Sequence, residues 1–154
     1  MRRVLVIGIG SLVMRDDGIG SRVVEALESS LQEHGIASFV GETDLEYCFD
    51  EIKPDDLVII IDAIAQDKEP GSIEVMLLSD ALINRGKLQT QHEFSLFDLI
   101  ELHVPQKRGC FIGIEVAEIG FSFDLSMPLK ERFEQICTSV LNTVLSIKEE
   151  EKDA

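Results

Sequence analysis

Cysteine is scarce in this 154-residue chain, and its distribution disfavours two kinds of chemistry. The three cysteines, Cys48, Cys110 and Cys137, are odd in number, far apart and without a C-x-x-C spacing. They do not indicate a cysteine metal site, and free thiols in a cytoplasmic protein are the simplest interpretation. A G-x-S-x-G elbow is missing as well, and no cysteine has an evident histidine partner. Serine and cysteine hydrolase mechanisms therefore have little support.

Basic residues are few compared with acidic ones. The chain has 14 lysines and arginines against 29 aspartates and glutamates, which gives a formal net charge of -15. This balance argues against binding to nucleic acid or to an acidic membrane surface, because both need basic patches. The acidity is typical of a solvated surface, and a partner with a basic patch stays open as an alternative.

Long hydrophobic runs are also missing. No window approaches the roughly 20 apolar residues of a membrane span. The apolar run from Val4 is interrupted by Gly8 and Gly10 and lacks a small-residue cleavage site, so it predicts a first strand rather than a signal peptide. With 45% hydrophobic residues, the chain can form one real core. We assign residues 1–148 to a single domain and residues 149–154 to a charged C-terminal tail that frays into solvent.

What is present is an alternation of strand-length apolar runs and helical stripes. We predict strands over residues 4–9, 37–40, 57–61, 72–78 and 110–116. We predict helices over residues 18–34, 45–52, 93–103 and 129–148. This order is typical of βαβ units, and it predicts an α/β protein with three α/β/α layers and a mostly parallel twisted sheet. Ligands of such sheets bind beyond the carboxyl ends of the strands.

A nucleotide site at the first of these ends is disfavoured. The Gly8-x-Gly10 pair would need a third glycine where the chain has Val13. Asp16 and Asp17 would face a pyrophosphate, and their charges would repel it. No Walker sequence is present.

Two acids and a histidine could instead form a site for a metal ion. Of Asp16 and Asp17, one could cap the following helix while the other points into the cleft. Asp62 directly follows the predicted strand 57–61, where a turn role and a ligand role are equally plausible. His92 lies in a polar segment before a helix, and taken alone it would be an exposed loop histidine. Together they make a mixed oxygen and nitrogen donor set that suits nickel or zinc and could activate a water.

Four blocks of sequence resemble a known family. They are VIGIGSLVMRDDGIGSRVVEAL, LVIIIDAIAQDKEPGSIEV, LQTQHEFSLFDLIEL and CFIGIEVAEIGFSFDLSMPLKERFEQ. In the same order and at similar spacing, they resemble the hydrogenase maturation endopeptidases, which remove a C-terminal extension from the large subunit of nickel-iron hydrogenases. The resemblance implies a phosphorylase/hydrolase-like fold and a cut made after nickel insertion. It places the family's metal-binding acids on Asp17 and Asp62 and its histidine on His92.

We therefore expect a cytoplasmic, monomeric, nickel-dependent endopeptidase of the aspartic/metallo type that acts on a hydrogenase large-subunit precursor. Asp17, Asp62 and His92 are the expected catalytic and metal-contacting residues. By the resemblance, the nickel is the precursor's own, and zinc or cadmium could replace it in a crystal. Asp16 is the candidate general base or helix cap. Departures from the family pattern include Glu42 and Glu115, which add negative charge near the cleft. The alternatives are a non-catalytic nickel-sensing or chaperone module, and a peptidase of this fold with an unrelated substrate.

Overall fold

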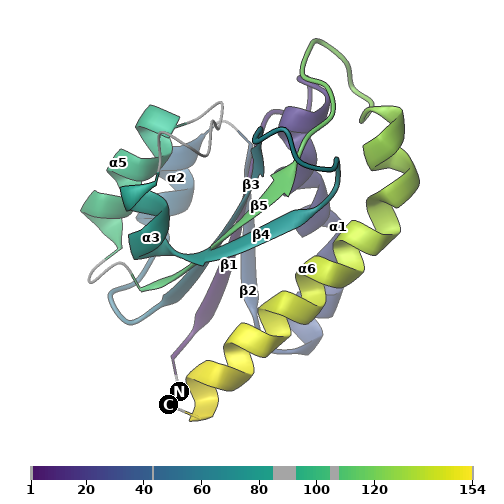
Figure 1. Ribbon diagram of the computed structural model, residues 1–154. Helices are drawn as coiled ribbons and strands as arrows, with labels where there is room; N and C mark the ends of the chain where they lie inside the picture. The colour runs from purple at the N-terminus through teal and green to yellow at the C-terminus, as the bar shows by residue number, and fades with distance from the viewer. Residues whose placement is uncertain (1, 43, 85–92, 105–107, 154) are drawn as a thin grey trace.

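The fold is built on a five-stranded sheet whose order is β2-β1-β3-β5-β4 (Figure 1). The structure is a computed structural model, which describes residues 2–42, 44–84, 93–104 and 108–153. The strands are β1 (Val4–Ile9), β2 (Ala37–Glu42), β3 (Leu57–Ile64), β4 (Ile73–Leu77) and β5 (Gly109–Glu115). The first three strands along the chain and β5 run parallel, while β4 pairs antiparallel with β5 at one edge. The predicted mostly parallel sheet is thus confirmed.

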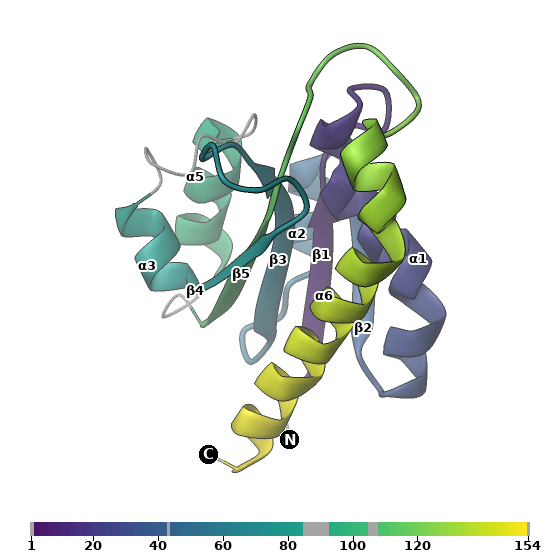
Figure 2. The same cartoon turned by 45° about the vertical axis from the view of Figure 1, so that its right-hand side comes forward.

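Helices cover both faces of this sheet, as the alternating sequence pattern predicts. One face carries α1 (Ile19–Glu33) and α6 (Met127–Asp153), and the other carries α2 (Leu45–Asp50), α3 (Leu78–Ile83) and α5 (Glu93–His103) (Figures 1 and 2). The side chains of β1 and β3 point alternately to the two faces, so the buried residues form two apolar clusters. One cluster joins the sheet to α1 and α6, and the other joins it to α2, α3 and α5.

Several predicted boundaries differ from those in the structure, and three of the differences are informative. β3 continues through Asp62 to Ile64, because a carboxylate that is buried inside the protein does not end a strand. The end of the predicted strand 72–78 is the start of α3, a helix too short to show a periodic stripe. The helix predicted to end at residue 148 continues to Asp153. Its Glu151 forms an ion pair of 3.1 Å with Arg2.

None of the helices in the described part of the chain is both long and apolar enough to cross a bilayer. The 27 residues of α6 would suffice in length, but its last turns are rich in glutamate and lysine.

Candidate active site

The candidate site lies at the carboxyl ends of β1 and β3, where two glycines allow a close approach of backbone. Gly10 follows β1 with a φ of 135°, and a Cβ there would lie 1.9 Å from the carbonyl oxygen of Asp17. A Cβ on Gly20, in the first turn of α1, would lie 2.3 Å from the carbonyl oxygen of Ile61. Neither position can accept a side chain without a shift of backbone. The two contacts therefore hold the turn that carries Asp17 directly over the end of the sheet.

Asp17 belongs to this turn, a short 3-10 helix η1 (Asp16–Gly18) that precedes α1. Its side chain is buried, and one carboxylate oxygen accepts a hydrogen bond of 3.0 Å from the backbone N–H of Ser11. Gly18 is the N-cap residue of α1 and no side chain caps the helix there. Asp17 thus precedes the N-cap position of α1 and belongs to the turn at the edge of the sheet.

Asp62 reaches the same edge from the neighbouring strand. It is fully buried in β3, opposite Gly113 of β5, and one of its oxygens accepts a hydrogen bond of 2.8 Å from the N–H of Ala63. The 3-10 turn packs against β3, so the structure brings the elements that carry Asp17 and Asp62 together. The third expected residue, His92, lies outside the described residues.

The residues described here contain no group of three or more histidine, cysteine, aspartate or glutamate side chains that could hold a metal ion. The two acids contribute carboxylate oxygens alone, which suit a hard cation. An imidazole from the segment before α5 would turn them into a mixed donor set for a borderline ion. The donor chemistry of Asp17 and Asp62 therefore fits the expected set of two acids and one histidine.

Asp16 holds a loop that lies about a hundred residues further along the chain. Its carboxylate is fully buried and accepts four hydrogen bonds of 2.7–2.9 Å. The donors are the backbone N–H groups of Ala117, Glu118 and Ser126 and the hydroxyl of Ser126. The expectation that Asp16 caps α1 is wrong, since its partners lie about a hundred residues away. Because both of its oxygens are engaged inside the protein, Asp16 is also poorly placed to act as a general base.

The partner of Asp16 is the segment from residue 117 to 126, which connects β5 to α6 and which we call the aromatic loop (Figures 1 and 2). It runs along the segment before Asp16. Arg15 donates its N–H to Ser122 at 3.1 Å, Ser122 donates to Val13 at 3.0 Å, and Asp16 donates to Glu118 at 3.3 Å. Sequence reasoning missed this pairing, because no local pattern links residues so far apart. The one available signal was Ser126 just before Met-Pro, which is typical of a helix start.

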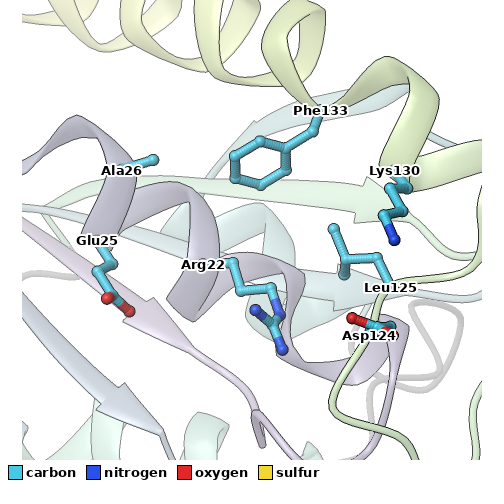
Figure 3. Close-up of a pocket in the computed structure, with 7 residues that line it drawn as sticks. All are labelled: Arg22, Glu25, Ala26, Asp124, Leu125, Lys130 and Phe133. Atoms are coloured by element: carbon cyan, nitrogen blue, oxygen red, sulfur yellow. The ribbon is translucent and has the colours of Figure 1, made fainter.

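A groove of about 510 Å³ lies behind the aromatic loop, between α1 and the start of α6 (Figure 3). It is lined by seven residues: Arg22, Glu25, Ala26, Asp124, Leu125, Lys130 and Phe133. The guanidinium of Arg22 donates to the carbonyl oxygens of Phe123 and Leu12, so it ties the loop to α1. Neither Asp17 nor Asp62 lines this groove, so the groove is separate from the candidate site.

Buried carboxylates are concentrated at this edge. Asp16, Asp17, Asp62 and Glu115 are all buried there, at the ends of three neighbouring strands. The carboxylate of Glu115 accepts the N–H of Gln66 at 3.0 and 3.1 Å. Buried acids raise the affinity of a site for cations, because few water molecules compete for the charge. This edge of the sheet therefore favours positively charged groups.

The cysteines are not equipped for nucleophilic catalysis. Burial raises the pKa of Cys48 and Cys110, and nearby acids raise it further. Burial and the charge of Glu134 raise the pKa of Cys137 to about 11. A reactive cysteine needs the opposite shift, toward the thiolate. The prediction that the described cysteines are free thiols is confirmed.

The geometry defines a class of protein: a three-layer α/β/α fold with acids at the carboxyl edge of its sheet. The hydrogenase maturating endopeptidase HybD from Escherichia coli has this fold. Its structure matches 94% of this chain and 93% of its own with a TM-score of 0.77 and 23% sequence identity.

Sequence comparisons define the family. A model described as HycI, hydrogenase maturation protease, matches residues 21–143. The match includes the positions of Asp62 and His92 and begins after Asp17. The chain belongs to the hydrogenase maturation protease family.

Two curated relatives are similar over parts of their length. The hydrogenase expression/formation protein HupD of Thiocapsa roseopersicina is 27% identical over 138 residues, which are 84% of this chain and 62% of HupD. The hydrogenase 2 maturation protease of Escherichia coli strain K12 is 30% identical over 103 residues, which are 64% of this chain and 61% of that protein. The chain thus spans less than two thirds of the length of either relative.

Proposed function

We propose that this protein is a cytoplasmic endopeptidase that removes the C-terminal extension of a nickel-iron hydrogenase large-subunit precursor after nickel insertion. In this proposal, Asp17, Asp62 and His92 contact the nickel that the precursor carries. The metal is part of the substrate, and the protease reads it as the signal that the precursor is ready to be cut. The observation that carries the proposal is the placement of two buried acids at the sheet edge of a chain that belongs to this family.

In the proposed reaction, both acids hold the nickel in a fixed position. Asp62 is fixed by β3, a rigid central strand, and Asp17 is fixed by backbone contacts at Gly10 and Gly20. Such rigid placement holds the nickel, and with it the neighbouring peptide bond, in one orientation for attack by water. Nickel supplies Lewis-acid chemistry that polarises a carbonyl or lowers the pKa of a water. Since Asp16 is engaged by the aromatic loop, the proton acceptor must come from another group at this edge.

The experiment compares two forms of the substrate. The purified protein is incubated with nickel-loaded and with nickel-free precursor, and the products are measured by mass spectrometry. We expect a shortened large subunit in the loaded sample alone. A nickel-sensing or chaperone module would bind the loaded precursor and leave it intact. A peptidase for an unrelated substrate would leave both forms intact and unbound.

Variants test the residues. Asp62→Asn keeps the shape of the side chain and removes its charge, and His92→Ala removes the imidazole. We expect each to lower the cleavage rate by at least about 100-fold, because each removes one of three metal contacts. Asp50→Asn is the matched control, since Asp50 is an exposed acid on α2. Cleavage by His92→Ala at the wild-type rate would remove His92 from the site.

A further inference from the structure

Exposed apolar side chains gather on the aromatic loop and the segments beside it. Among the described residues, eleven large hydrophobic side chains are exposed, and five of them lie here. They are Val13, Ile119, Phe121, Phe123 and Met127. The rings of Phe121 and Phe123 are the extreme cases, since these residues are 89% and 77% exposed. The other described phenylalanines are buried or half-buried. A concentration of this kind marks a surface that binds a partner.

The loop that presents these rings is already ordered. Its backbone is hydrogen-bonded to residues 13–16, Asp16 binds both of its ends, and Arg22 binds the carbonyl oxygen of Phe123. A surface that is held in place in the free protein loses little conformational entropy when a partner binds. Exposed rings on a rigid loop are therefore suited to act as anchors.

The loop also lies next to the candidate active site. It begins at the end of β5 and arches over to the start of α6 (Figure 2). It therefore starts from the same edge of the sheet as Asp62, the edge at the carboxyl ends of the parallel strands. Asp16, which holds it, is the immediate neighbour of Asp17. A polypeptide that brings a peptide bond to the acids therefore reaches an edge of the sheet that the aromatic loop also borders.

Charge distinguishes among the possible occupants. The loop itself carries two acids, Glu118 and Asp124, and no basic residue. Arg15 forms an ion pair of 3.4 Å with Glu118, and the whole chain has a net charge of -15. A second copy of the chain would bring the same negative charge, and an anionic membrane would be repelled as well. A segment with apolar residues and basic flanks is attracted by both the rings and the field.

We propose that the aromatic loop is a docking surface for an apolar segment, flanked by basic side chains, of the polypeptide that the protein cleaves. This inference rests on the proposed function and adds a specificity surface to it. Phe121 and Phe123 anchor the segment, and Asp16 and Arg22 hold the loop in position. The surface contributes to substrate affinity and leaves the chemical step to the acids.

The experiment uses the double variant Phe121→Ser/Phe123→Ser, with Ile83→Ser as the control. Ile83 is 80% exposed at the end of α3, so both variants remove exposed apolar area. We expect the double variant to raise KM for the nickel-loaded precursor about tenfold or more, with kcat unchanged, because two anchors are lost. The control keeps the wild-type KM. Raising the salt concentration raises the wild-type KM, because it screens the charge of the protein.

Binding is measured separately, with Asp62→Asn as the uncut background. A tenfold loss of precursor binding on adding the two serines supports the docking surface even if the wild-type protein does not cleave, and in that case the proposed function alone fails. An unchanged KM and unchanged binding overturn the docking surface while cleavage stands. Sedimentation of the wild-type protein as a dimer that the two serines dissociate would overturn it in favour of a second copy. Ring-dependent binding to phosphatidylcholine vesicles containing phosphatidylglycerol would overturn it in favour of a membrane.

Discussion

Replacing Asp16 tests whether this acid holds the aromatic loop. In Asp16→Ala, the N–H groups of Ala117, Glu118 and Ser126 lose their acceptor inside the protein, and so does the hydroxyl of Ser126. A buried donor left without a partner costs about 1–3 kcal/mol. Relief of the buried charge and entry of water offset part of this cost. We therefore expect a loss of about 3–5 kcal/mol in the free energy of unfolding.

Asp16→Asn is the milder variant and guards against a complete loss of folding. An amide oxygen can replace the carboxylate oxygen that accepts three of the four bonds, but the amide nitrogen then faces the N–H of Ser126. One mismatched pair of donors predicts a loss of about 2 kcal/mol. For a chain of this length, that corresponds to a fall in Tm of roughly 4–8 °C.

Urea unfolding followed by circular dichroism measures both losses, and hydrogen exchange at Ala117 and Glu118 shows whether the loop opens. Asp124→Asn is the control, because Asp124 is exposed on the same loop and should stay within about 0.5 kcal/mol of wild type. The reasoning is refuted if Asp16→Ala unfolds within 1 kcal/mol of wild type. It is equally refuted if the exchange of the two amides is unchanged in both variants.

Three further predictions concern stability and reactivity. Burial tends to raise the pKa of Asp56, but its hydrogen bonds and ion pair with Arg3 outweigh this and lower the pKa below its usual 3.8. The stability that Asp56 contributes is therefore fully present above its unfolded pKa and is lost as the pH falls through its folded pKa. Urea unfolding at pH values from 7 to 2.5 should show this fall in the free energy of unfolding. The fall should be smaller in Asp56→Asn. Burial raises the pKa of Cys137 from the usual 9.0 to about 11, so at pH 8 its thiol should react with iodoacetamide about 100-fold more slowly than a free thiol. A reaction rate like that of glutathione would show that the thiol is not buried. Gly20→Ala should destabilise the protein by about 2 kcal/mol or more, because its Cβ meets the backbone of Ile61, and an unchanged midpoint in urea would show that α1 can move away from the sheet.

Much of the fold could be predicted from the sequence, because its elements carry strong periodic patterns. The strand that begins at Val4, the strand that begins at Leu57 and the helix from Glu93 to His103 follow from patterns a few residues long. The predicted boundaries were wrong where a charged residue is buried or is held by an ion pair. Asp62 lies inside a strand, and the charged end of α6 is held by an ion pair with Arg2.

The candidate site could be predicted in part. The expectation that Asp17 and Asp62 lie at the carboxyl ends of strands followed from the alternation of elements, and the structure places both at one edge. The division of work between Asp16 and Asp17 could not be predicted. It depends on Ser126, 110 residues further along the chain, and a local pattern cannot show which of two adjacent acids meets it.

The ion pair between Arg2 and Glu151 has a practical consequence for anyone handling this protein. It brings the two ends of the chain together at the edge where β1 begins, far from the edge where β1 ends (Figure 1). An affinity tag or a fluorescent reporter attached at either end would thus leave the opposite edge of the sheet accessible to a large binding partner. A short linker could also join the two ends into a circle, and new ends could then be opened elsewhere on the surface.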